Sequence, residues 1–237
     1  MPSERWCGRC SLPSDAPVHA ALAAVRERIA AACARAGRSP AEVTLVAVTK
    51  GRTADEVRAL VDAGQHDLAE NRVQAWRDAA AVLEGREVAW HLIGHLQRNK
   101  VRFCRPFELI HSIDSLRLAQ ALDAEGAKHA HRFDVLVQVN VSAEESKYGV
   151  SPTALPALLE EVERLPFVRA RGLMTMAPFD VDPERARPHF RALRALAERY
   201  ALSELSMGMS GDFEVAVEEG ATLVRIGSAL FEPTGAA

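Results

Sequence analysis

Val43-Thr44-Leu45-Val46-Ala47-Val48-Thr49, residues 43–49, is a run of strand length that is rich in valine and lacks the alternation of a half-exposed strand. A helical pattern from Ala54 to Ala63 follows it. Continuous apolar runs, such as Val135-Leu136-Val137 further on, are typical of strands buried on both faces, which are parallel and joined by crossover helices. Residues 43–63 therefore predict a first β/α unit.

The same alternation continues along the chain. The further strand candidates are His66–Ala69, Val88–Ile93, Glu108–His111, Phe133–Val139, Arg169–Met174, Glu204–Met207 and Thr222–Ile226. About eight β/α units that close on themselves give a single (β/α)8 TIM-type barrel, the α/β fold we expect here. The alternative is an open doubly wound sheet, but residues 50–53 (Lys-Gly-Arg-Thr) stand where its glycine-rich dinucleotide turn would be.

An extra helix is predicted before the first strand. Apolar residues recur at helical spacing from Val18 to Ala36, and Gly37 stands where a helix should end. These apolar positions are Val18, Leu22, Val25 and Ile29. With no Pro/Gly-rich linker after residue 40, one barrel domain is expected over residues 18–237, preceded by a disordered tail over residues 1–17.

Composition narrows the classes of function. Hydrophobic residues make up 48% and charged residues 26% of the 237 residues, as in ordinary globular proteins. A net charge of −3 provides no general attraction to nucleic acid or to an anionic membrane surface. No apolar run is long enough to span a membrane and no secretory signal begins the chain, so a cytoplasmic location is expected.

The four cysteines do not predict a disulfide framework or a metal site. Cys7, Cys10, Cys33 and Cys104 are few and unevenly spaced. The Cys7–Cys10 pair superficially resembles a thioredoxin motif, but no strand precedes it and Pro13 follows closely. A structural zinc site needs four ligands, and the chain has no second pair of this kind. We expect no metal.

Lys50 is the first candidate for chemistry. In a β/α barrel the reactive groups lie at the carboxyl ends of the strands, and Lys50 ends the first strand run. An amine held close to low-dielectric walls is more often neutral, and therefore nucleophilic toward an aldehyde. From position alone, a solvated lysine in a loop remains the more common alternative.

A phosphate site is predicted after the seventh and eighth strands. Residues 207–212 (Met-Gly-Met-Ser-Gly-Asp) open a helix, and Gly227 and Ser228 follow the last strand. Many barrels bind phosphate with these two loops, where glycine permits close backbone approach. Ser210, Gly211, Gly227 and Ser228 are the candidates, although each could separately be a helix cap or a turn residue.

An ordered set of short motifs identifies a family. The motifs are Lys50, Glu70-Asn71, Trp90-His91-Leu92-Ile93-Gly94, Leu96-Gln97, Asn99-Lys100, Ser146-Lys147, Gly172-Leu173-Met174, Leu205–Ser210 and Val224-Arg225-Ile226-Gly227. In this combination the chain resembles the pyridoxal phosphate homeostasis proteins, in register from about Val18 to Phe231. Their fold is a barrel like the N-terminal domain of alanine racemase, a fold-type III barrel.

The resemblance implies a role for each matching position. Lys50 matches the lysine that binds pyridoxal 5′-phosphate covalently as a Schiff base, and Asn71 lies near the ring. Ser210, Gly211, Gly227 and Ser228 match the groups that hold the phosphate, and Arg225 matches the arginine that faces the pyridine nitrogen. Met174 and Ile93 would pack against the cofactor. These assignments are expectations carried over position by position.

Arg225 has a chemical consequence if it faces the ring nitrogen. A permanent cation there discourages protonation and weakens the ring as an electron sink, so carbanion chemistry would be restrained. An ion pair between Arg225 and an acidic residue such as Glu70 is the alternative. Trp90 and His91 alternate on one strand, so only one can face the barrel interior, and His91 is expected to be a satisfied core histidine.

Some positions depart from the family pattern or are assigned only loosely. Leu68-Ala69 replaces the usual Phe-Gly and Gly51-Arg52 replaces Thr-Lys, while Glu232 replaces a frequent glycine. The first two adjoin the site and put cofactor orientation and affinity in doubt. Lys147 matches a further family lysine, a secondary site for the aldehyde or simply a solvated loop residue.

The resemblance implies a carrier that stores or delivers the cofactor, with apo-enzymes as recipients, rather than an enzyme. The alternative is a racemase-like enzyme with weak activity. Racemisation needs an acid and a base on opposite faces of the substrate, and the related racemases take the second group from a further β domain. Tyr148, expected in a loop at the open end of the barrel, is the best candidate for such a group here. A monomer or weak dimer is expected.

Overall fold

The computed structural model describes residues 16–142, 148–178 and 180–231. Within them, eight parallel strands close into a barrel in the order β1-β2-β3-β4-β5-β6-β7-β8. The strands are β1 (Thr44–Val48), β2 (Asp67–Glu70), β3 (Ala89–Leu92), β4 (Phe107–Ile113), β5 (Phe133–Gln138), β6 (Val168–Met174), β7 (Glu204–Ser206) and β8 (Leu223–Ile226). The TIM-type barrel predicted from the sequence is therefore confirmed.

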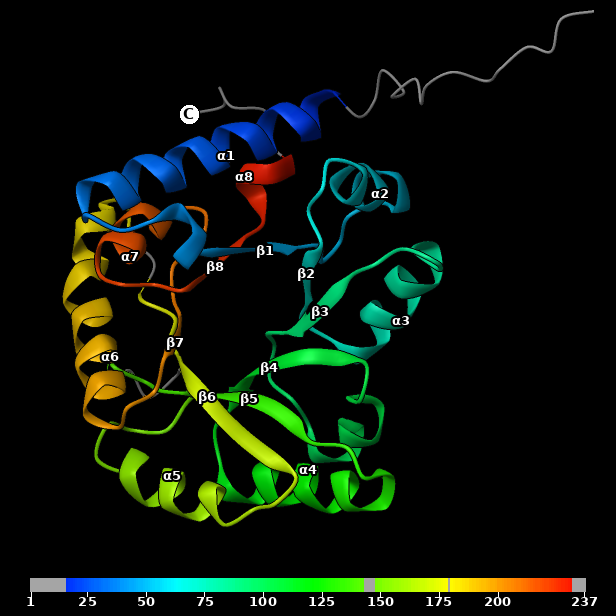
Figure 1. The fold of residues 1–237 in the computed structure, drawn as a ribbon, viewed down its shortest axis with the longest axis vertical. Coiled ribbons are helices and arrows are strands. Elements are labelled where there is room, and N and C mark those ends of the chain that lie inside the picture. Colours follow the sequence, from blue (N-terminus) through cyan, green and yellow to red (C-terminus); the bar gives the residue numbers. More distant parts are fainter. Residues whose placement is uncertain (1–15, 143–147, 179, 232–237) are drawn as a thin grey trace, which may run out of the picture.

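Helices surround the ring of strands on its outside (Figure 1). The α-helices are α1 (Ala16–Arg35), α2 (Ala54–Asp62), α3 (Val73–Val82), α4 (Leu116–His129), α5 (Leu155–Glu163), α6 (Arg187–Arg199), α7 (Phe213–Glu218) and α8 (Ser228–Phe231). Short 3-10 helices cover Pro40–Glu42, Arg98–Phe103 and Pro183–Ala186. In the parts of the chain described here, none of these helices combines the length and apolar character needed to cross a lipid bilayer.

The extra helix α1 lies across α7 and α8 (Figure 1). The four apolar positions predicted for its inner face, Val18, Leu22, Val25 and Ile29, are all buried. The helix begins at Ala16, so the last two residues assigned to the tail, Ala16 and Pro17, are helical. Residues 1–15, with Cys7 and Cys10, lie outside the described residues. Cys33 and Cys104 are buried free thiols.

Apolar side chains form two layers, one inside the barrel and one between the barrel and its helices. The inner layer consists of Val46, Val48, Ala69, Leu109, Leu136, Met174 and Leu223. The outer layer is larger and contains the apolar faces of the helices. Trp90 belongs to the outer layer, while His91 faces His111 in the interior, as alternation along β3 requires.

Strand β4 is longer than its sequence pattern predicts. It extends from Phe107 to Ile113 instead of ending at His111. Its polar residues His111 and Ser112 are fully buried, and the Ser112 hydroxyl donates to the Gly94 carbonyl at 2.6 Å. Because internal hydrogen bonds satisfy these side chains, polar residues continue a buried strand where the apolar pattern stops.

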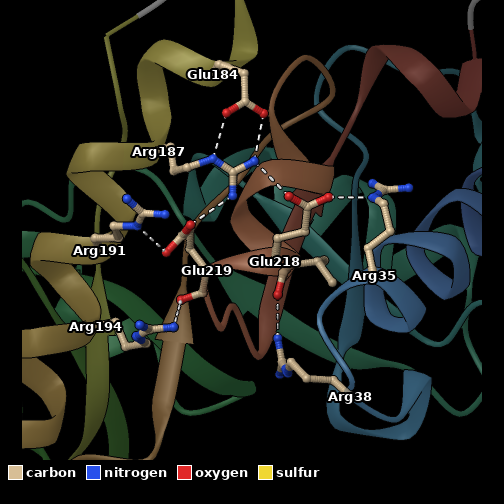
Figure 2. A network of polar contacts seen from close by, with 9 residues as sticks. Arg35, Arg38, Glu184, Arg187, Arg191, Arg194, Glu218 and Glu219 are labelled. Atoms are coloured by element: carbon tan, nitrogen blue, oxygen red, sulfur yellow. Dashed lines mark hydrogen bonds and ion pairs between the residues drawn. The ribbon is translucent and has the colours of Figure 1, made fainter.

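A network of ion pairs joins the outer helices α1, α6 and α7 (Figure 2). Arg187 of α6 binds Glu184, Glu218 at the end of α7 and Glu219 directly after that helix. Arg35 of α1 binds Glu218 at 2.6 Å, and Arg38 donates to the Val217 carbonyl at 2.7 Å. Residues Pro183–Ala186 form a 3-10 turn, and α6 begins directly after it at Arg187, with a proline in its first turn.

Candidate functional site

A cavity of about 660 Å³ opens at the carboxyl ends of the strands. Of the nine residues predicted for the site, eight line it: Lys50, Asn71, Ile93, Ser210, Gly211, Arg225, Gly227 and Ser228. They come from the ends of β1, β2, β3 and β8 and from the loop after β7. The volume is that of a typical small-molecule site. Closure of the barrel thus brings together residues that are far apart in the sequence.

Lys50 follows β1 by two residues and is exposed at the cavity. The preceding Thr49 is buried, and Val48 forms part of the cavity wall. The expectation of an amine held against low-dielectric walls is therefore met only in part, because the walls are present but the amine itself is accessible to solvent. An accessible amine can be reached by an incoming aldehyde.

Glu70, at the end of β2, places a buried carboxyl group near Lys50. Its Oε1 accepts a hydrogen bond from the Thr49 hydroxyl at 2.6 Å, while Oε2 is buried without a hydrogen-bond partner among the described residues. Burial raises the pKa of the Glu70 carboxyl; the Thr49 and Asn71 hydrogen bonds and the Lys50 charge act in the opposite direction. Glu70 does not pair with Arg225, which was the alternative considered from the sequence.

Asn71 reaches the cavity, and the segment that follows β3 packs very closely against its backbone. A Cβ atom on Gly94 would lie 2.1 Å from the Asn71 carbonyl oxygen, so only glycine fits there. Gly94 and its neighbour Ile93 both line the cavity. The glycine after β3 is therefore what allows the Asn71 segment to approach.

Two backbone N–H groups converge on the hydroxyl of Ser210, one of the predicted phosphate residues, in an arrangement called here the Ser210 cradle. The N–H groups of Gly227 and Ala229 both donate to the Ser210 hydroxyl oxygen, at 3.2 Å and 3.4 Å. Gly208 has φ +91°, and a Cβ atom there would lie 2.5 Å from the Ala216 Cβ of α7. The donors converge on one oxygen atom, which is the arrangement that a phosphate oxygen requires.

Arg225 is a buried cation that lines the cavity. Its Nη1 donates to the Ser206 hydroxyl at 2.6 Å and its Nη2 to the Thr175 carbonyl at 2.9 Å. Burial lowers the pKa of Arg225 to about 10, and the charge of Asp212 acts in the opposite direction. The guanidinium therefore stays positively charged at neutral pH.

The expectation for Met174 needs a correction. Met174 is fully buried in the inner layer of the barrel and does not line the cavity. Met176, two residues further on, does line it. Residues i and i+2 of an extended chain point to the same side, so Met174 and Met176 share a side of the chain. The sequence motif therefore identified the correct side, but Met174 lies deeper in the barrel than the cavity wall.

Two aromatic rings stack at the cavity, and one of them, His95, was not predicted from the sequence. His95 stacks on Tyr148 with ring centroids 4.5 Å apart, and its Nδ1 lies 3.3 Å from a carboxylate oxygen of Asp114. Both rings line the cavity, and Tyr148 is 58% exposed. Tyr148 was expected at the open end, and the position of His95 three residues after β3 is the signal that would have found it. Lys147 lies outside the described residues.

Arg52, in the segment that departs from the family pattern, also lines the cavity. Its guanidinium lies 4.5 Å from the centroid of the Phe231 ring. Among the described residues, no group of three or more His, Cys, Asp or Glu side chains is arranged to hold a metal ion. The donor set consists of amine, guanidinium and backbone N–H groups, which is suited to an anionic organic ligand.

A closed β/α barrel with a lysine, a buried arginine and two convergent backbone N–H groups at its carboxyl end defines the class of alanine racemase-like barrel proteins. Residues 21–234 match the family described as "Alanine racemase, N-terminal domain". An alanine racemase of Clostridium difficile has the same fold, with a TM-score of 0.72 at 12% identity over 93% of this chain and 58% of that one.

Closer relatives identify the family within this class. A pyridoxal phosphate homeostasis protein of Deinococcus radiodurans is 48% identical, covering 90% of this chain and 99% of its own length. PipY of Synechococcus elongatus, in a structure with PLP bound, has a TM-score of 0.78 at 34% identity, covering 90% of this chain and 99% of that one. The chain belongs to the pyridoxal phosphate homeostasis protein family.

Proposed function

We propose that this chain binds pyridoxal 5′-phosphate in the cavity at the open end of its barrel and takes part in keeping the intracellular level of this cofactor in balance. The observation that carries the proposal is the convergence of Lys50, Arg225 and the Ser210 cradle on one cavity. The names of the relatives agree with it. Storage of the cofactor and its delivery to apo-enzymes in the cytoplasm are the finer parts of the proposal.

The residues present fit the cofactor at both of its ends. Pyridoxal phosphate supplies an aldehyde that condenses with a primary amine, and Lys50 is the exposed amine of this cavity. We assign the covalent bond, a Schiff base, to Lys50. The N–H groups of Gly227 and Ala229, with the hydroxyls of Ser210 and Ser228, would hold the phosphate.

Arg225 restricts what the bound cofactor can do. A guanidinium at the pyridine nitrogen keeps that atom unprotonated, because a second positive charge beside it is unfavourable. The ring is then a weak acceptor of electrons from an attached amino acid. A carrier with little or no amino acid turnover is therefore the expected behaviour.

One observation favours a second candidate function, a weak racemase-like activity. Tyr148 lines the same cavity as Lys50 and presents its side chain to solvent. Lys50 and Tyr148 would then be the two acid–base groups that such a reaction needs. Steady racemisation of an amino acid, abolished in Tyr148→Phe, would support this second function.

Borohydride reduction followed by peptide mass spectrometry tests the covalent bond. Purified protein incubated with pyridoxal 5′-phosphate should show an absorption band that disappears on reduction, with the added mass on Lys50. Lys50→Ala should lose the band, while Lys100→Ala, which changes a lysine in the 3-10 helix after β3, should keep it. A label on Lys147 in addition would identify a secondary site. A label confined to a residue other than Lys50 would contradict the assignment.

Transfer to a recipient tests the carrier function. The loaded protein is mixed with the apo-form of a pyridoxal phosphate-dependent enzyme, and recovery of that enzyme's activity is followed over time. Faster recovery than with an equal amount of free cofactor would support delivery. A recovery rate set only by the spontaneously released cofactor would support storage without delivery.

A further inference from the structure

Five polar side chains cross the barrel interior from β8 to β2 in one continuous series of hydrogen bonds. Arg225 Nη1 lies 2.6 Å from Ser206 Oγ, which lies 2.8 Å from His111 Nδ1. His111 Nε2 lies 3.0 Å from His91 Nδ1, and His91 Nε2 lies 3.2 Å from Asp67 Oδ1. The series begins at Arg225, which lines the cavity at the carboxyl ends of the strands. It ends at Asp67, the first residue of β2.

Burial makes every link of this series significant. Ser206 and His111 have no exposed surface, and His91 and Arg225 are 3% and 4% exposed. Asp67 alone reaches solvent, with 37% of its side chain exposed. Water cannot replace the inner partners, so a broken link would leave a buried polar group unpaired.

The order of donors and acceptors follows from the two ends. A guanidinium can only donate, so Ser206 Oγ accepts from Arg225, and a carboxylate can only accept, so His91 Nε2 donates to Asp67. His91 Nδ1 then accepts a hydrogen bond from His111 Nε2, and His111 Nδ1 accepts a hydrogen bond from the Ser206 hydroxyl. With neutral imidazoles, this is the one arrangement that satisfies every atom, and both histidines carry their proton on Nε2.

The electrostatics of the core agree with a neutral His111. Burial places the pKa of His111 well below its ordinary value, and the Arg225 charge acts in the same direction. Since all hydrogen bonds point the same way, from Arg225 toward the Asp67 carboxylate, each donor polarises the next. The Ser206 oxygen, which accepts the hydrogen bond from Arg225, becomes a stronger acceptor as a result.

We propose that Ser206, His111, His91 and Asp67 form a one-directional hydrogen-bond chain that fixes the Arg225 guanidinium in the cavity, which makes them positioning residues for the cofactor ring. The chain uses one guanidinium N–H and the Thr175 carbonyl uses a second, so the other donors are left for a ligand. This inference rests on the proposed function only in that the ligand is pyridoxal phosphate.

Nuclear magnetic resonance of the histidine side chains tests the chain without any ligand. Nitrogen chemical shifts of the cofactor-free protein, assigned with His91→Gln and His111→Gln, distinguish the two neutral tautomers and the imidazolium. Both histidines are expected to be neutral with the proton on Nε2. A proton on Nδ1 of His111, or a charged His111 at neutral pH, would overturn the proposal.

Equilibrium binding tests the positioning role. Ser206→Ala removes the link next to Arg225 and should raise the Kd for pyridoxal 5′-phosphate about tenfold, with a shift in the absorption maximum of the bound cofactor. Asp67→Ala changes only the far end and should raise the Kd about threefold. His66→Gln, which alters an exposed histidine next to Asp67 in sequence, is the matched control and should leave the Kd unchanged.

These outcomes distinguish a positioning role from a purely structural role, and both from an error in the proposed function. A lower melting temperature in Ser206→Ala and Asp67→Ala with unchanged Kd and spectrum would overturn the positioning role. If Ser206→Ala does not fold, Asp67→Ala and the tautomers of the unmodified protein still decide. If the unmodified protein does not bind the cofactor, the proposed function is wrong, while the tautomer measurement still tests the hydrogen-bond chain.

Discussion

The Arg187 guanidinium lies 2.8 Å from the carboxylate of Glu219, and this contact joins α6 to the end of α7 (Figure 2). Glu219 is only 4% exposed, so its charge depends on Arg187 and on Arg191, which binds it at 3.0 Å. Helix α7 follows directly after the loop that carries Ser210. The ion-pair network therefore fixes the helix that directly follows the Ser210 loop.

Arg187→Ala should destabilise the protein by about 2 kcal/mol, because a buried carboxylate loses one of its two partners. Arg164→Ala is the matched control, since Arg164 pairs with Glu160 and Glu161 on the exposed surface of α5 and should cost less than about 1 kcal/mol. Urea unfolding measures both. Equal losses in the two variants would show that the network does not depend on burial.

Stability should fall as the pH drops below about 6.5, because His111 is neutral in the folded protein and takes up a proton on unfolding. A folded pKa below the unfolded value gives stability that is complete above the unfolded pKa and lost below it. Between about pH 7.5 and about pH 5.5, the unmodified protein should lose about 1 kcal/mol relative to His111→Gln, measured by urea unfolding. An equal pH dependence of the two proteins would refute the neutral, buried histidine.

Gly94→Ala should disturb the site, because the new Cβ atom would overlap the Asn71 carbonyl unless the loop moves. We expect a loss of about 2 kcal/mol in stability and weaker cofactor binding. Gly211→Ala, whose Cβ atom would meet no atom within 4 Å, should change the stability by less than about 0.5 kcal/mol. Thermal unfolding of the cofactor-free variants separates these outcomes.

The two methionines after the sixth strand should behave differently. Met174→Ala opens a hole in a fully buried layer and should cost about 2–5 kcal/mol of stability. Met176→Ala should leave stability nearly unchanged and raise the Kd for pyridoxal phosphate, because Met176 lines the cavity. A raised Kd in Met174→Ala with no loss of stability would restore the original prediction from the sequence.

The sequence predicted the barrel well because strands such as β1 and β5 contain continuous apolar runs and strand and helix patterns alternate, which is visible without coordinates. It predicted the strand ends least well where polar residues are satisfied inside, as with His111 and Ser112 in β4. The site residues came from motif order together with the rule that reactive groups follow strands. Depth within the barrel, which separates Met174 from Met176, depends on packing across several strands and has no local signal.

The inner hydrogen-bond chain is the part that no sequence pattern could supply. Asp67, His91, His111, Ser206 and Arg225 come from five strands, and only closure of the barrel makes them neighbours. His91 was correctly predicted to be a satisfied core histidine, but its partner His111 was not identified. The hydrogen-bond partners of a single histidine in a strand cannot be read from the sequence. Once His91 and His111 face each other, their hydrogen bonds define the network.

The Ser210 hydroxyl accepts hydrogen bonds from the backbone of Gly227 and Ala229, and in the proposed complex a phosphate oxygen would take its place. On this proposal, an arriving ligand exchanges one oxygen acceptor for another, so neither loading nor unloading leaves these part-buried N–H groups without a partner. In the proposed complex, affinity would come from charge and from the covalent bond to Lys50, and a competing amine could displace Lys50 from the aldehyde. Because the two N–H groups keep a hydrogen-bond partner when the ligand leaves, the site favours reversible binding, which the proposed carrier function requires.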